Sequence, residues 1–83
     1  MPYYVYILQS DANGSYYIGQ TKDLYARFER HNKGMETFSR KHRPWSLLWY
    51  CQKASRSDAV KLERTLKNLN RDRLGEFLRK YSI

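Results

Sequence analysis

The chain has 83 residues, enough for one small domain with a modest hydrophobic core. Its single cysteine, Cys51, excludes an internal disulfide, and one cysteine with two histidines gives no zinc-ligand spacing. Sixteen Lys and Arg against eight Asp and Glu leave a formal net charge of +8, which indicates a polyanionic partner such as nucleic acid. The alternative is that the surplus basic residues only keep a small protein in solution.

The sequence also bears on where the protein is found. No apolar run approaches the length of a membrane span, and the amino terminus lacks the ordered basic, apolar and small residues of a leader. We therefore expect a cytoplasmic protein without a membrane partner, and nothing in the sequence indicates an obligate protein partner. Residues 1–83 are expected to form a single domain.

The chain opens with a predicted β-hairpin. Residues Tyr4–Leu8 and Tyr16–Gly19 are rich in tyrosine, valine and isoleucine, and Asn13-Gly14 is a typical turn between them. Side chains alternate along each strand, so Tyr6 and Tyr17 can be held by neighbouring strands. We expect the second strand to end at its glycine, where the missing side chain would let the backbone approach a phosphate.

A first helix is predicted from Lys22 to Asn32, with Thr21 as its hydroxyl cap. It is expected to stop at Gly34, because glycine commonly follows the last helical residue. Residues Met35–Pro44 then form a predicted loop.

The aromatic run Trp45–Gln52 predicts a third strand, buried on at least one face. A second helix is expected to begin at Ser55, with Asp58 three residues later as in a capping box, and a third follows the capping residue Asn70. The predicted order ββαβαα indicates an α+β fold in which helices flank a small antiparallel three-stranded sheet.

Polar residues with a recognisable order lie on these elements. Tyr17-Ile18-Gly19 is followed by Arg27, ten positions after Tyr17, then by His31, and later by Glu63 on the second helix. Together with Tyr4-Val5-Tyr6, this set resembles the GIY-YIG nuclease family. The first motif of that family begins with glycine, and this chain has Tyr4 at that position. The resemblance covers nearly the whole chain and is closest to the small bacterial single-domain members of the UPF0213 type.

The resemblance implies a metal-dependent endonuclease that hydrolyses DNA phosphodiester bonds, with structure selectivity or weak specificity and a role in repair or recombination. It implies that Tyr6 or Tyr17 activates the attacking water, a task for which a phenol, of unperturbed pKa near ~10, needs a nearby cation. Arg27 would contact phosphate oxygens, and His31 would orient a tyrosine or contact the phosphate. Glu63 would bind Mg²⁺ or Mn²⁺, because magnesium needs only one or two carboxylates beside water and phosphate.

Helical geometry supports this interpretation and leaves alternatives open. At roughly 100° per residue, Arg27 and His31 fall in the sector that holds Phe28, and so both point toward the sheet. Alternatively, Arg27 lies along the rim of the core and His31 is a satisfied, partly buried histidine. Glu63 lies at the border of an apolar sector, and its alternative role is an ion pair with Lys67, a contact that contributes only ~0.3–0.5 kcal/mol.

The basic residues are interleaved with aromatic residues, which suggests a folded basic surface. Nucleic-acid contacts are expected from Lys22, Arg30, Lys33, Arg40, Lys41 and Arg43. Many family members have a basic residue directly after the motif glycine; this chain has Gln20 there, and Lys22 is the candidate substitute. Four tyrosines are interpreted as packing residues, namely Tyr3, Tyr16, Tyr50 and Tyr81. The alternative function is a non-catalytic basic module that retains the fold and binds DNA or RNA.

Overall fold

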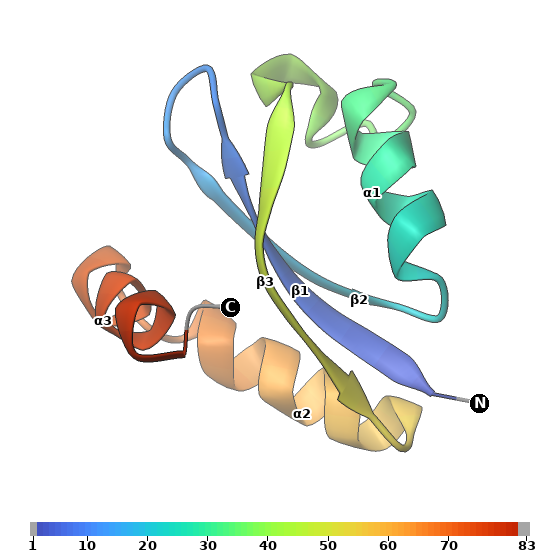
Figure 1. Ribbon diagram of the computed structural model, residues 1–83, viewed down its shortest axis with the longest axis vertical. Helices are drawn as coiled ribbons and strands as arrows, with labels where there is room; N and C mark the ends of the chain where they lie inside the picture. Colours follow the sequence, from blue (N-terminus) through green and yellow to red (C-terminus); the bar gives the residue numbers. More distant parts are fainter. Residues whose placement is uncertain (1, 82–83) are drawn as a thin grey trace.

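The computed structural model describes residues 2–81, in which a three-stranded sheet is covered by helix α1 on one face and by α2 and α3 on the other (Figure 1). The strands are β1 (Tyr3–Ser10), β2 (Tyr16–Thr21) and β3 (Trp45–Lys53), antiparallel in the order β2-β1-β3. The helices are α1 (Leu24–Asn32), the short 3-10 helix η1 (Arg40–His42), α2 (Arg56–Lys67) and α3 (Arg71–Tyr81). This confirms the predicted α+β fold and its order.

The strand register fixes where the tyrosines lie. Tyr6 of the central strand pairs with Gly19, and Leu8 pairs with Tyr17. The two motif tyrosines are therefore diagonal neighbours on one face of the sheet. The hairpin turn is longer than a two-residue turn, and Gly14 within it has a φ of 78°, which glycine adopts without strain.

Alternation along β1 divides the core between the two faces of the sheet. The cluster beneath α2 and α3 consists of Val5, Ile7, Trp49, Ala59, Leu66 and Leu74. The cluster beneath α1 consists of Tyr6, Leu8 and Trp45, with Tyr17, Leu24, Phe28 and Leu47 packed against it. The candidate tyrosines thus belong to the smaller, more polar side of the molecule.

The ends of the helices follow capping chemistry, with one correction at α1. Its N-cap is Asp23, whose Oδ1 accepts a hydrogen bond from the Ala26 amide at 3.1 Å, and its first residue is Leu24. The expectation of a Thr21 cap and a Lys22 start was wrong, because β2 continues through Thr21, which pairs with Tyr4 and is only 8 % exposed. An aspartate is favoured at this position since it also interacts with the helix dipole.

The other predicted helix boundaries are confirmed. Gly34 follows α1 with a φ of 76°. Ser55 Oγ accepts a hydrogen bond from the Asp58 amide, and Asn70 Oδ1 accepts one from the Arg73 amide. None of the helices within residues 2–81 has the length and apolar character needed to cross a membrane.

Candidate active site

A buried chain of hydrogen bonds joins the central strand, helix α1 and the loop before η1. Tyr6 Oη lies 3.1 Å from His31 Nε2, and His31 Nδ1 lies 2.6 Å from Ser39 Oγ. The backbone carbonyl of Ser39 accepts a hydrogen bond from Trp45 Nε1 at 2.9 Å. Because Tyr6, His31 and Ser39 are at most 1 % exposed, water does not compete for these contacts. A neutral imidazole donates through one nitrogen and accepts through the other, so His31 links the two hydroxyls.

Burial keeps the hydrogen-bonded side chains of Tyr6 and His31 uncharged. Removal from water raises the pKa of Tyr6, the nearby Tyr17 raises it further, and the charge of Arg27 acts in the opposite direction. Burial also lowers the pKa of His31 below its ordinary value of 6.5, against the attraction of the Glu36 carboxylate. At neutral pH Tyr6 is therefore a phenol and His31 a neutral imidazole.

The glycine of the second motif makes room for Tyr6. A Cβ placed on Gly19 would lie 2.5 Å from Tyr6 Oη and 2.7 Å from its Cζ, distances that side chains do not tolerate. Tyr6 is thus able to extend over β2 and reach His31. This differs from the expectation that the missing side chain lets the backbone approach a phosphate, because the space is filled by the phenol.

Tyr17 lies beside the buried hydrogen bonds of Tyr6, His31 and Ser39, and its own hydroxyl is free. Its ring centroid is 4.6 Å from that of His31 and 6.3 Å from that of Tyr6. Within residues 2–81 no hydrogen bond involves its hydroxyl, and no buried side-chain polar atom lacks a partner, so this hydroxyl reaches solvent. Tyr17 also lines a hollow of about 490 Å³ together with Phe38 and Lys67. Of the two motif tyrosines, Tyr17 is the one available to a solvent molecule.

A second hollow, of about 450 Å³, carries the arginine of the motif. We call it the arginine pocket; its charged and polar lining consists of four cations, one acid and two neutral side chains: Lys22, Arg27, Arg30, Arg56, Asp23, Gln20 and Thr21. Arg27 and Arg30 both approach Glu36 Oε1, with their Nε atoms at 3.8 and 2.7 Å. The hydrogen bond from Arg30 lowers the pKa of Glu36. Glu36 therefore holds the two guanidinium groups in place, and the four cations of the pocket outnumber its single acid, Asp23, which suits it to a phosphate.

Glu63 lies on helix α2, which packs against the face of the sheet opposite to α1. Its Oε2 lies 2.7 Å from Lys67 Nζ, and its side chain is 20 % exposed. Arg56, seven residues earlier, and Lys67, four residues later, share its helix face, and each lines one of the two hollows just described. Glu63 therefore lies along α2 between the two hollows. Within residues 2–81 no hydrogen bond or ion pair joins it to the motif residues of α1 and the strands.

The donor chemistry of Glu63 fits a magnesium ion. A half-buried carboxylate supplies the hard oxygen that Mg²⁺ prefers, and the ion tolerates a single protein ligand when water and phosphate complete its shell. In the described part of the chain no three His, Cys, Asp or Glu side chains form a metal-ligating group. An ion at this site would therefore depend on Glu63 and on substrate.

The residues predicted to contact nucleic acid occupy two regions instead of one. Lys22 and Arg30 line the arginine pocket. Lys33 forms an ion pair with Glu29 at 3.2 Å. The other three, Arg40, Lys41 and Arg43, are exposed at or next to η1, which follows the carboxyl end of α1 and lies beside it (Figure 1).

Sequence reasoning missed several side chains of this site. Ser39 and Glu36 fall in a segment predicted only as loop, and their contacts to α1 had no periodic signal. Arg56 was not singled out, and Lys67 was considered only as the ion-pair partner of Glu63, a contact that the structure confirms. Their seven- and four-residue spacing from Glu63 was the available signal, since it places all three on one helix face.

Comparison with known proteins is consistent with this architecture. Residues 2–80 match the model of the GIY-YIG catalytic domain. A UPF0213 protein of Streptococcus pneumoniae is 37% identical over 76 residues, covering 90% of this chain and 76% of that protein, and one of Staphylococcus aureus is 33% identical over 72 residues, covering 86% and 87%. The solution NMR structure of a UPF0213 protein from Bacillus halodurans has a TM-score of 0.62 at 30% identity, covering 94% of this chain and 83% of that one. The chain belongs to the GIY-YIG family of nucleases.

Proposed function

We propose that this protein is a metal-dependent endonuclease that hydrolyses DNA phosphodiester bonds, with structure selectivity or weak specificity, in repair or recombination. The observation that carries the proposal is the buried chain Tyr6–His31–Ser39 beside the free hydroxyl of Tyr17, with Arg27 nearby. Core packing alone does not require a histidine that is 0 % exposed and hydrogen-bonded at both nitrogens to hydroxyl groups. Family membership supplies the reaction class.

Each side chain has a role in this proposal. Arg27 contacts the attacked phosphate, for which a planar guanidinium is suited, and Lys22 and Arg56 contact neighbouring phosphates. The hydroxyl of Tyr17 is the group next to the attacking water, because it alone of the two motif hydroxyls is free. Tyr6 and His31 position the Tyr17 ring through their packing against it. Glu63 would hold the Mg²⁺ or Mn²⁺ ion, which supplies charge stabilisation at the phosphate and the leaving oxygen.

A nicking assay tests the proposal directly. Supercoiled, branched and flapped DNA are incubated with the protein, with and without Mg²⁺, and the nicked products are quantified. We expect Tyr17→Phe to abolish cleavage and Tyr6→Phe to reduce it severely, while DNA affinity and fold are retained. The control is Tyr81→Phe on α3, whose side chain is 51 % exposed and which should cleave at the normal rate. Full activity of the double variant Tyr6→Phe/Tyr17→Phe would overturn the assignment.

The ion pair between Glu63 and Lys67 favours a second candidate, the non-catalytic module that binds DNA or RNA. The substitution Glu63→Gln separates the two functions because it keeps the shape and removes the charge. If Glu63 holds a metal ion, cleavage falls by orders of magnitude, while metal-free DNA binding is unchanged or tighter. If it only pairs with Lys67, stability falls by about 0.5 kcal/mol or less and no metal-dependent activity is lost. Lys67→Met is the matched control, since it breaks the same ion pair and leaves the carboxylate.

A further inference from the structure

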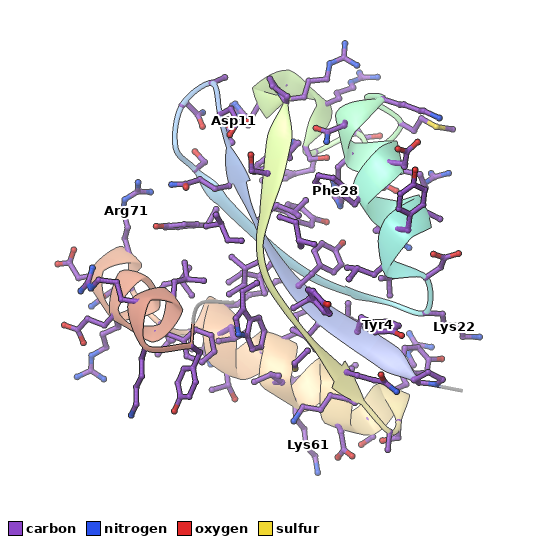
Figure 2. The ribbon with its side chains drawn as sticks, viewed as in Figure 1. Tyr4, Asp11, Lys22, Phe28, Lys61 and Arg71 are labelled. Carbon is purple, nitrogen blue, oxygen red and sulfur yellow. The ribbon has the colours of Figure 1, made fainter. Side chains whose placement is uncertain are left out.

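A hollow of about 740 Å³ opens between the first half of α1 and the sheet, on the face that carries the motif tyrosines. Its walls combine three phenols with three apolar side chains: Tyr4, Leu24, Tyr25, Phe28, Leu47 and Tyr50. We call it the tyrosine hollow. Phe28 extends from α1 toward the sheet, and Tyr4 lies on β1 below the start of α1 (Figure 2). It is an aromatic recess open to solvent.

Two of its tyrosines are more exposed than packing requires. Tyr25 is 74 % exposed and Tyr50 is 43 % exposed. The interpretation of Tyr50 as a packing residue was therefore wrong, because its ring faces this open recess; the same interpretation was wrong for Tyr81 on α3, which is 51 % exposed. Large aromatic side chains left in water beside a recess are typical of a binding surface.

The tyrosine hollow adjoins the proposed active site on two sides. Across the sheet, Tyr50 is the register partner of Tyr6, whose other partner is Gly19. Along the turn from β2 to α1, Lys22 and Asp23 line both the tyrosine hollow and the arginine pocket. An aromatic recess and a cationic pocket therefore share one wall.

The side chains of the tyrosine hollow and the arginine pocket indicate which kind of ligand would bind there. A ligand that fills both must have a flat apolar part and an anionic part joined by a short link, and a nucleotide within a strand has these properties. A second copy of this chain is disfavoured, since each copy carries a formal net charge of +8. Base stacking on aromatic side chains beside a basic groove is how proteins bind single strands.

We propose that the tyrosine hollow binds an unpaired nucleobase of DNA while the arginine pocket holds the adjoining phosphates, so that the substrate contains an unpaired segment at the cleavage site. This inference rests on the proposed function for its choice of DNA. A base paired within a duplex cannot enter the recess, because its faces are covered by stacked neighbours. The preference for branched or flapped DNA would follow from this recess.

Equilibrium binding without metal tests the inference. The purified full chain is titrated, in EDTA, into a fluorescently labelled single-stranded oligonucleotide and into the same strand with a run of abasic sites. The variants are Tyr25→Ala, Tyr50→Ala and Tyr25→Phe, the last of which keeps the ring. Tyr81→Ala is the matched control, since it removes an exposed tyrosine of α3 that packs against Phe77, on the opposite face of the sheet from the tyrosine hollow. Thermal denaturation of each variant checks that the fold is retained.

We expect the normal strand to bind more tightly than the abasic one. Tyr25→Ala should weaken binding of the normal strand by about 5- to 150-fold and leave the abasic strand unaffected, while Tyr25→Phe and Tyr81→Ala retain the preference. Equal affinity for the two strands, or an equal loss on both, would overturn the inference. So would a dimer in sedimentation that Tyr25→Ala dissociates, because a second copy would then fill the recess.

Failure here is distinguishable from failure of the proposed function. Binding is measured without metal, so a protein that prefers the normal strand but never cuts would support the recess and refute the endonuclease. A protein that cuts fully paired DNA and ignores the abasic change would support the endonuclease and refute the recess.

Discussion

The substitution Gly19→Ala tests whether the Tyr6–His31 contact shapes this fold. Its added Cβ would meet Tyr6 Oη at 2.5 Å, Tyr6 Cζ at 2.7 Å and Tyr17 Cε1 at 3.2 Å. Tyr6 cannot move away easily, since it is 1 % exposed and hydrogen-bonded to His31. The backbone offers no obstacle of its own, because Gly19 does not have a positive φ.

The magnitude follows from two opposing terms. Overpacking a buried site costs about 1–3 kcal/mol, and replacing glycine by alanine within a strand returns about 0.5–1 kcal/mol. Because two contacts fall below 3.0 Å, we take the upper part of the overpacking range, about 2–3 kcal/mol, and expect a net loss of about 1–2.5 kcal/mol in the free energy of unfolding. Such a loss lowers Tm by about 4–20 °C in a domain of this size. Cleavage should fall by about 100-fold or more, because the tyrosines are displaced from their working positions.

Urea unfolding followed by the fluorescence of Trp45 and Trp49 measures the change. Gly75→Ala is the matched control: a Cβ there meets only Arg79 Nη1, at 3.7 Å, and alanine inside α3 should raise stability by about 1 kcal/mol. Replacing glycine by alanine is thus expected to lower the free energy of unfolding at position 19 and to raise it at position 75. In a Tyr6→Ala background, Gly19→Ala should destabilise much less, because only the contact with Tyr17 Cε1 at 3.2 Å remains. A Gly19→Ala protein as stable as the original, or an unchanged penalty without the Tyr6 ring, would refute the packing argument.

Two further predictions concern charge. Burial holds the pKa of His31 below 6.5 in the folded protein, so the unfolded chain binds more protons at mildly acidic pH. The free energy of unfolding should therefore be constant above about pH 6.5 and fall as the pH drops below it. Urea titrations at pH 5 to 8 measure this dependence, which His31→Gln should remove. DNA binding should weaken linearly in log affinity against log salt, and Arg40→Ala or Lys41→Ala should weaken all sequences alike, whereas a flat salt response in fluorescence titrations would favour a protein partner.

The fold was predictable because local patterns agreed with the tertiary structure. The alternating tyrosines and Asn13-Gly14 predict the hairpin, and Gly34, Ser55 and Asn70 mark helix ends that the structure confirms. The start of α1 was not predictable, because Thr21 and Asp23 are both good caps. Asp23 is the N-cap because Thr21 pairs with Tyr4 in the sheet, and this long-range contact cannot be read from the sequence.

The candidate site was predictable only in part. Helical periodicity predicted that His31 points toward the sheet, and the structure places it there, although its catalytic role stays a prediction. Ser39 carried no signal, since a serine in a polar loop is usually exposed and its burial here depends on contacts with His31 and Trp45. Tyr50 was misassigned because a strand aromatic is normally buried, and the extent of α1 over the sheet cannot be read from β3 alone.

The position of β2 at the edge of the sheet explains how so small a chain assembles the site. An edge strand is flanked by the layers on both faces, so α1 carries Arg27 and His31 on one side of β2 while α2 carries Glu63, the proposed metal ligand, on the other. An unpaired edge is also prone to pair with other chains, and nearby charged side chains prevent this. Arg56 and Lys67 lie where they serve that purpose and where a phosphate backbone would pass. We therefore expect one set of cations to discourage edge pairing in the free protein and, in the proposed function, to neutralise the substrate when DNA is bound.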